Sequence, residues 1–264
     1  MSDGPGASSL RVRIGGLPID RLTLDGAIAA IDELVSSGQG GAVFTPNVDH
    51  VVEYQDNARL REAYEAASLS LVDGVPVLWA SHLLGEPLPE KVSGSDLVMP
   101  LLRHAAKRGW RVFLLGGGDG VAEMAKRSLE TSIPGIDVVG ALSPRIDMRQ
   151  ESAVRAPVVE AVGSAKPHIV IVALGAPKQE LFIHETREAL RPAVLLGLGA
   201  SLDFIAGTVP RAPGWISRSG LEWLFRLSRE PKRLWRRYLL RDPKFLLILA
   251  RSVRKRGKPE TALH

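Results

Sequence analysis

The sequence lacks cysteine altogether and contains no long apolar segment. Without cysteine, a disulfide scaffold, an iron–sulfur cluster, a thiolate zinc site and a cysteine nucleophile are excluded. The longest apolar runs, at 169–174, 194–198 and 245–250, cover about 5–7 residues each, whereas a membrane-spanning helix needs about 20. The amino terminus also lacks a basic segment followed by an apolar run, so we expect no secretory signal.

Motifs that mark several enzyme classes are missing as well. The histidines form no His-Glu-x-x-His pair, and the sequence contains neither Asp-x-Asp nor a Gly-x-Ser-x-Gly elbow. Metal-dependent hydrolysis and serine hydrolysis are therefore not supported. We expect neither a metal ion nor a cofactor.

The composition is ordinary, but the charge is unevenly distributed. Apolar residues make up 45% and charged residues 24% of the 264 residues, which is average for a globular protein. Residues 1–210 hold 19 Lys and Arg against 25 Asp and Glu, whereas residues 211–264 hold 15 against 4. The basic carboxyl-terminal part therefore predicts an anionic partner: nucleic acid, phospholipid headgroups or a phosphorylated substrate.

Short apolar runs of strand length alternate with helical patterns along most of the chain. This alternation predicts an α/β fold with a Rossmann-like, mostly parallel sheet and helices on both faces. The expected strands are 42–45, 68–72, 110–115, 136–139, 168–174 and 193–198. The expected helices are 24–36, 58–67, 95–108, 120–132, 150–164 and 178–190.

After Gly207 the pattern changes to prolines, basic residues and helical segments at 215–228 and 231–240. We therefore expect an α/β core at 10–209, preceded by a flexible start at 1–9. A basic helical appendage that associates with a membrane is expected at 210–250, followed by a disordered tail at 251–264. Its interleaved Trp, Tyr and Arg residues suit a membrane interface and also single-stranded nucleic acid. The membrane is the favoured partner, because the core lacks a recognisable nucleic-acid motif.

Polar residues follow the first two expected strands of the parallel sheet. Thr45 and Asn47 flank Pro46 after one strand, and Asp73-Gly74 follows the next. Parallel strands bind ligands at their carboxyl ends. Asn47 can instead cap a helix, and Asp-Gly is a common turn pair, so each residue has a structural alternative to a functional role.

Glycine-rich exits follow the later strands. Gly116 and Gly117 open a loop that could cradle phosphate or form only a tight turn. Gly175 precedes a helix whose first turn contains Gln179, an amide suited to sugar hydroxyls or a base edge. Asp203 follows the last glycine-rich exit.

Five segments taken together resemble the WecG/TagA/CpsF family of bacterial glycosyltransferases over about residues 10–245. They are Thr45-Pro-Asn47, Asp73-Gly74, Lys91-Val-Ser-Gly-Ser-Asp96, Gly175-Ala-Pro-Lys-Gln179-Glu180 and Arg211-Ala-Pro-Gly-Trp215. The resemblance implies an inverting, metal-independent transfer of a hexose, often N-acetylmannosamine, from a UDP-sugar. The implied acceptor is a sugar linked to a polyprenyl diphosphate, in the synthesis of a cell-surface polysaccharide.

The resemblance also implies residue roles. Asp73 would be the general base, and Thr45, Asn47, Lys91, Gln179 and Arg211 would contact substrates. Gly116, Gly117, Gly175, Gln179 and Asp203 would lie at the nucleotide. Lys91 stands where the family usually has Arg, which keeps the charge but loses the bidentate geometry.

A set of arginines in the basic appendage would meet the diphosphate or the membrane: Arg218, Arg226, Arg229, Arg233, Arg236 and Arg237. The expected location is cytoplasmic, peripheral to the inner face of the bacterial cell membrane. A homo-oligomer is compatible with this interpretation, and nucleic acid is not an expected partner. The alternatives are a non-catalytic module that binds a sugar nucleotide and a basic α/β protein that binds nucleic acid.

Overall fold

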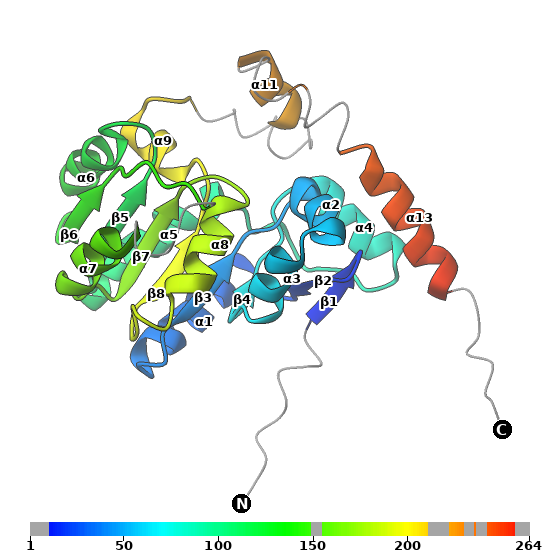
Figure 1. Cartoon of the computed structure of the whole chain (residues 1–264), viewed down its shortest axis with the longest axis horizontal. Helices are drawn as coiled ribbons and strands as arrows, with labels where there is room; N and C mark the ends of the chain where they lie inside the picture. Colours follow the sequence, from blue (N-terminus) through cyan, green and yellow to red (C-terminus); the bar gives the residue numbers. More distant parts are fainter. Residues whose placement is uncertain (1–10, 149–154, 211–221, 230–234, 236–241, 257–264) are drawn as a thin grey trace, which may run out of the picture.

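Six parallel strands form the central sheet of the protein (Figure 1). The computed structural model describes residues 11–148, 155–210, 222–229, 235 and 242–256. The strands are β3 (Gly41–Phe44), β4 (Leu69–Ser70), β5 (Arg111–Gly116), β6 (Asp137–Leu142), β7 (Ile169–Ala173) and β8 (Val194–Gly197). Their order in the sheet is β4-β3-β8-β7-β5-β6, and every pairing is parallel. The predicted α/β fold with a parallel sheet is confirmed.

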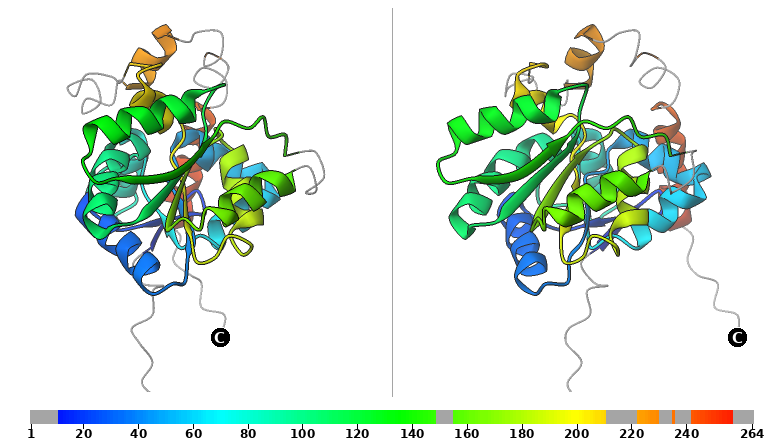
Figure 2. Two further views of the ribbon diagram at one scale, coloured as in Figure 1. Left: turned by 90° about the vertical axis from the view of Figure 1, so that its left-hand side faces the viewer. Right: turned by 60° about the vertical axis from the view of Figure 1, so that its left-hand side comes forward.

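Helices cover both faces of this sheet (Figure 2). The core on one face receives buried residues from α2 (Val48–Asp56), α3 (Ala58–Glu65), α4 (Val75–Leu83), α7 (Ala156–Ser164), α8 (Lys178–Thr186) and α13 (Lys244–Arg256). The core on the other face receives them from α1 (Leu24–Ser36), α5 (Gly94–Arg108), α6 (Val121–Ser132) and α9 (Ser201–Ala206).

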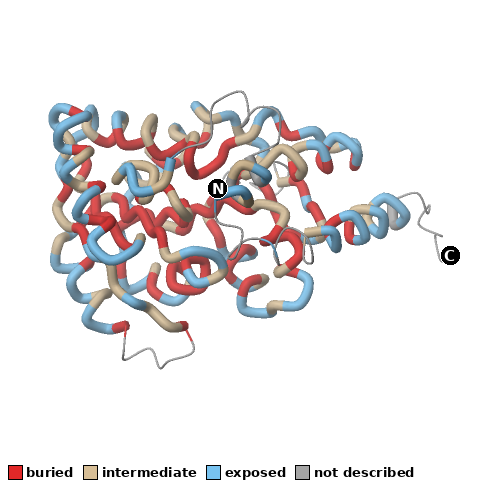
Figure 3. The backbone as a smooth tube through the Cα atoms, turned by 90° about the horizontal axis from the view of Figure 1, so that it is seen from above, coloured by how far each residue is buried: buried red, intermediate tan, exposed pale blue. Residues whose placement is uncertain are grey.

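Strand β7 shows why the apolar runs of the sequence are continuous. Val170 and Val172 point into one core, Ile169 and Ile171 point into the other, and all four are fully buried. A strand covered on both faces has no solvent-facing positions, so its sequence does not alternate. Figure 3 shows the resulting buried layer through the middle of the molecule.

A short antiparallel hairpin precedes the sheet and was not predicted from the sequence. It comprises β1 (Arg11–Ile14) and β2 (Leu17–Asp20). The Asp20 carboxylate accepts hydrogen bonds from Arg11 at 2.8 Å and from the Ser70 amide at 2.7 Å. Because Ser70 belongs to β4, these bonds fix the hairpin beside that edge of the sheet.

Helix α13 belongs to the basic carboxyl-terminal part of the chain and packs against the core. Its Phe245 and Ile248 are buried, while Leu246 and Leu247 are more than 60% exposed. The helix continues to Arg256, whereas the sequence suggested that the helical appendage ends at residue 250. In the described part of the chain, no helix combines the length and hydropathy that a bilayer crossing requires.

Parts of the sequence-based expectation fall outside the described residues. These are the start at 1–10, the segments 149–154, 211–221, 230–234 and 236–241, and the end at 257–264. Within the basic appendage, helix α11 (Glu222–Arg229) is described. Figure 1 places it on the side of the sheet toward which β5 and β7 point.

Candidate active site

The carboxyl ends of the strands meet along one edge of the sheet, where the sequence predicts the site. The helices that follow β3, β5 and β7 begin at this edge, with Asn47, Gly120 and Pro177 as their first cap residues. Helix α5, whose N-cap is Ser93, also approaches this edge: a Cβ atom on Gly94 would lie 2.9 Å from the Leu198 carbonyl oxygen. Several helix amino termini, which favour negative charge, therefore gather here.

Thr45 and Asn47, which follow β3, make different kinds of hydrogen bond. The buried Thr45 hydroxyl donates to the Gly197 carbonyl oxygen at 3.2 Å, which ties the exit of β3 to that of β8. Asn47 caps α2 by accepting from the Asp49 amide at 3.1 Å. The structural alternative for Asn47, a helix cap, is thus realised, and its side chain still lies at the strand-end edge.

Asp73 lies half-buried beside Asn47. Its amide donates to the Pro46 carbonyl oxygen at 2.9 Å. A Cβ atom on the next residue, Gly74, would come within 4.0 Å of the Asn47 Cβ. The backbone of Asp73 is thereby held at the edge of the sheet, and the half-buried residue lies close to Asn47.

A buried tyrosine, Tyr64, is influenced electrostatically by the Asp73 carboxylate. Tyr64 is fully buried, and its hydroxyl has no hydrogen-bond partner among the described residues. Burial raises the pKa of Tyr64 well above its usual value, and the charges of Glu180 and Asp73 raise it further. Tyr64 therefore stays protonated.

Lys91 places a positive charge at the same edge, where it is paired with Asp96. Its ammonium lies 2.6 Å from the Asp96 carboxylate, which also accepts from the Ser93 hydroxyl at 2.6 Å. Ser93 in turn caps α5. Lys91 is therefore positioned by the first turn of α5.

Gln179 is buried rather than facing outward. Its Nε2 donates to the Glu180 carboxylate at 2.8 Å, and its Oε1 accepts from the Gly199 amide at 3.0 Å. The same carboxylate lies 3.2 Å from Nε2 of His50. Both ends of the Gln179 amide are thus bonded within the protein, and its expected contact with a sugar nucleotide stays a prediction.

The glycine-rich exits adopt the tight turns that their residues allow. Gly116 has φ +113° and lies against Ala173, and the Gly117 amide donates to the Ala173 carbonyl oxygen at 2.8 Å. Gly175 has φ +76° and open space around it. Asp203 lies in the first turn of α9, where its backbone carbonyl accepts from Thr208.

The arginines of the basic appendage are only partly described. Arg211, Arg218, Arg233, Arg236 and Arg237 lie outside the described residues, as does the side chain of Arg226. The Arg229 guanidinium lies over the Phe225 ring, 5.5 Å from its centroid. The proposed contacts of these arginines therefore stay predictions.

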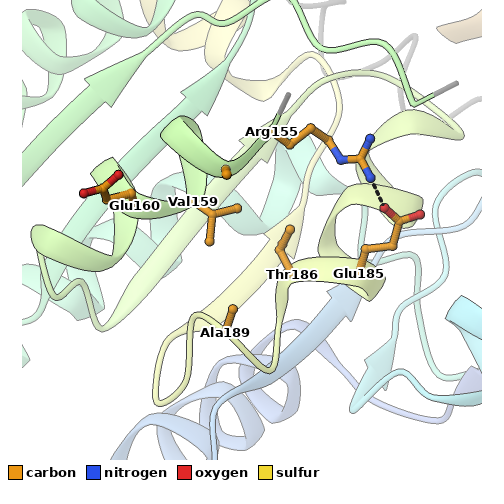
Figure 4. Close-up of a pocket in the computed structure, with 7 residues that line it drawn as sticks. Arg155, Val159, Glu160, Glu185, Thr186 and Ala189 are labelled. Atoms are coloured by element: carbon orange, nitrogen blue, oxygen red, sulfur yellow. Dashed lines mark hydrogen bonds and ion pairs between the residues drawn. The ribbon is translucent and has the colours of Figure 1, made fainter. Parts of the chain in front are cut away.

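Away from the strand ends, a cavity of about 390 Å³ lies between α7 and α8 (Figure 4). The nearly buried Arg155 guanidinium pairs with Glu185 at 2.5 Å on its rim, and apolar residues such as Val159 line much of the rest. Among the described residues, no three His, Asp or Glu side chains cluster closely enough to hold a metal ion.

The sequence analysis missed two buried residues that pack together near Asn47: His50 and Tyr64. His50 lies three residues after Asn47, and its side chain accepts from the Asn47 amide as the second half of a capping box. That spacing was a usable signal, although Glu or Gln normally takes the position. Tyr64 had no local signal, because its neighbours come from distant segments.

Comparison with known proteins gives one family and several relatives. The family model described as "Glycosyl transferase WecG/TagA/CpsF family" matches residues 12–259. An enzyme of Bacillus spizizenii (strain W23) named N-acetylglucosaminyldiphosphoundecaprenol N-acetyl-beta-D-mannosaminyltransferase is 33% identical over 225 residues, which are 85% of this chain and 84% of the relative. An enzyme of the same name from Bacillus subtilis (strain 168) is 33% identical over 203 residues, 75% of this chain and 76% of the relative.

Proposed function

Because the chain belongs to the WecG/TagA/CpsF family of glycosyltransferases, we propose that it moves N-acetylmannosamine, or a closely related hexose, from a UDP-sugar to a polyprenyl-diphosphate-linked sugar. The name of the two Bacillus relatives supports N-acetylglucosamine as the acceptor sugar and a β-linked product. Inversion at the anomeric carbon of an α-linked UDP donor gives that β linkage. Family membership makes the chain a hexosyltransferase, in place of the non-catalytic and nucleic-acid-binding alternatives.

The half-buried carboxylate of Asp73 is the observation that carries the mechanism. It lies at the carboxyl edge of the sheet, where parallel sheets bind their ligands. In the proposed reaction it takes the proton of the acceptor hydroxyl, whose oxygen attacks the anomeric carbon from the face opposite the departing UDP. The bond between that carbon and the diphosphate oxygen breaks, and UDP leaves with the electron pair.

The departing diphosphate needs positive charge nearby. Helices α6 and α8 begin at this edge with Gly120 and Pro177 as N-caps, and the positive ends of their dipoles favour an anion there. Some first-turn amides already bond within the protein: Ala122 donates to the Ser143 hydroxyl at 3.2 Å and Gln179 to the Gly175 carbonyl oxygen at 3.0 Å. Lys91 adds an ammonium group. We propose that these groups, with the arginines of the appendage, stabilise the leaving UDP without a metal ion.

The exposed face of α13 supports a membrane-surface location. Leu246, Leu247 and Val253 are exposed there together with the cations Lys244, Arg251 and Arg254. Apolar and basic side chains on one helix face suit an anionic lipid surface. Such a location would bring the enzyme to a lipid-linked acceptor.

Replacement of the proposed base tests the function most simply. We expect Asp73→Asn to lower kcat by at least about 100-fold, because the general base is lost. UDP affinity, measured by calorimetry, should stay close to that of the wild type. Glu62→Gln, which changes an exposed carboxylate on α3, is the control and should leave both values unchanged. Turnover by Asp73→Asn at the wild-type rate would refute the assignment.

A further inference from the structure

Glu180 is a fully buried carboxylate in the first turn of α8, the helix that follows β7 at the carboxyl edge of the sheet. Its exposed fraction is 0%, and those of His50 and Gln179 are 5% and 3%. Its Oε1 atom accepts hydrogen bonds from two side chains: from the His50 Nε2 atom at 3.2 Å and from the Gln179 Nε2 atom at 2.8 Å. A buried charge is costly unless such partners are present.

These bonds continue outward to two different strand exits. His50 Nδ1 accepts from the Asn47 amide at 3.2 Å, where β3 leaves the sheet. Gln179 Oε1 accepts from the Gly199 amide at 3.0 Å, where β8 leaves it. We call these five residues, Asn47, His50, Gln179, Glu180 and Gly199, the strand-exit network. It joins the exits of β3 and β8 through the first turn of α8.

Packing alone does not account for a carboxylate at this position. The next three residues of α8, Leu181–Ile183 in sequence, are apolar and buried. Well-packed apolar groups often stabilise a core as much as a buried ion pair or more. A polar network, by contrast, fixes distances and angles between the groups that it joins.

We propose that Glu180 is a positioning residue for the transfer reaction, which holds the loops bearing Asn47 and Gly199 at a fixed separation through His50 and Gln179. The proposal rests on the proposed function and goes beyond it, because Glu180 and His50 touch no substrate in this scheme. In the network Gln179 also acts by positioning, since both ends of its amide are bonded to the protein.

Tyr64 packs against the network near the proposed base. Its fully buried ring lies edge-on to the His50 ring, at 6.2 Å between centroids. The charges of both Glu180 and Asp73 raise its pKa. A shift of His50 would therefore disturb the packing of Tyr64 and the exit of β3, where Asn47 lies beside the segment Asp73-Gly74.

Glu180→Gln tests the proposal, because it keeps the size of the side chain and removes its charge. Ile183→Val is the matched control: Ile183 is fully buried on the same helix, outside the network. We expect kcat to fall at least about 10-fold in Glu180→Gln, since small misplacements at a reaction centre have large effects, with a smaller change in donor KM. Ile183→Val should lower Tm through lost core packing and leave kcat near the wild-type value.

Hydrogen exchange gives a readout that does not depend on the substrates. Exchange at the exits of β3 and β8 should be faster in Glu180→Gln than in Ile183→Val. His50→Gln should behave as Glu180→Gln does, and it serves as the test variant if Glu180→Gln does not fold. The double variant should lose no more activity than the more impaired single one, because linked residues act non-additively.

Two results would overturn the proposal: exchange at both exits equal to that of the control, or a kcat that follows stability alone. A wild-type enzyme inactive on the proposed donor and acceptor would instead refute the proposed substrates. In that case the exchange comparison still decides whether Glu180 holds the two exits together.

Discussion

Lys91 contributes a positive charge to the proposed site, and that charge is paired with a carboxylate. Its ammonium is held at 2.6 Å by Asp96, which itself accepts from the Ser93 hydroxyl. An incoming diphosphate would share this cation with Asp96. Lys provides one point charge here, whereas the Arg usual in the family would offer two parallel donors. We therefore expect the helix amino termini around it to contribute more of the diphosphate binding than they would beside an arginine.

Glu65 joins the amino-terminal hairpin to α3 and makes stability depend on pH. The Arg13 guanidinium, 2.6 Å away, lowers the pKa of Glu65 from its usual 4.5 to about 2, with help from the Tyr54 hydroxyl. The charged form is thus favoured in the folded state. Its stabilising effect is complete above pH 4.5 and is lost as the pH falls toward 2.

Glu65→Gln should therefore lower the free energy of unfolding at pH 7 by about 1 kcal/mol, a small value because the pair is partly exposed and screened by solvent. The deficit relative to the wild type should shrink as the pH falls below 4.5. Urea denaturation at several pH values measures it, with Glu62→Gln on the same helix as control. A deficit that persists unchanged at low pH would contradict this explanation.

Gly116 is required by backbone geometry where β5 ends. It has φ +113°, and a Cβ atom there would lie 2.5 Å from the Ala173 carbonyl oxygen. Gly116→Ala should cost about 2–4 kcal/mol, because strain and a backbone clash add. Gly120→Ala, at φ +77° with no atom within 4 Å, should cost only about 1–2 kcal/mol. Equal losses of stability in urea denaturation would show that the close approach to Ala173 is unimportant.

At the scale of elements, the parts that the sequence predicts are those with strong periodicity. The helix expected at 24–36 agrees at both ends with α1, and the apolar run at 168–174 contains β7. Helix α4 was missed because its Val75–Leu83 segment is short, apolar on most sides and begins with proline in its first turn. The strand-exit network could not be predicted, because it depends on contacts between residues 130 positions apart, His50 and Glu180.

Helix α13 is the element whose exposed face we propose to bind a membrane surface. Neutralising Lys244, Arg251 and Arg254 with glutamine should weaken binding to anionic vesicles by about 100-fold, at about 1 kcal/mol for each basic residue. The fold should survive, because Phe245 and Ile248 hold the helix on the core. Vesicle sedimentation measures the change.

The control for that experiment neutralises three exposed cations on α5 and α6, Arg103, Lys107 and Arg127. Both triple variants lose the same net charge. The control should bind vesicles nearly as the wild type does. Equal weakening in the two variants would mean that net charge, rather than the face of α13, governs binding.

At the scale of the whole molecule, the overall charge of +5 describes neither part of the chain. The sheet and its helices form an acidic body whose strand ends gather Asp73, Lys91 and several helix amino termini. The basic residues are concentrated after residue 210, and within that part α13 packs on the body beside α2. The proposed catalytic edge and the basic face of α13 on one fold fit the proposed enzyme, whose two substrates would be a nucleotide sugar and a lipid-linked sugar.

Mass measurement of the lipid product tests the central claim most directly. Wild type and Asp73→Asn would each receive UDP-N-acetylmannosamine and polyprenyl-diphosphate-linked N-acetylglucosamine, with and without EDTA. We predict that the wild type extends the acceptor by one N-acetylhexosamine in both conditions, and that Asp73→Asn leaves it unextended. An acceptor that the wild type leaves unchanged, or that both proteins extend equally, would contradict the proposed reaction.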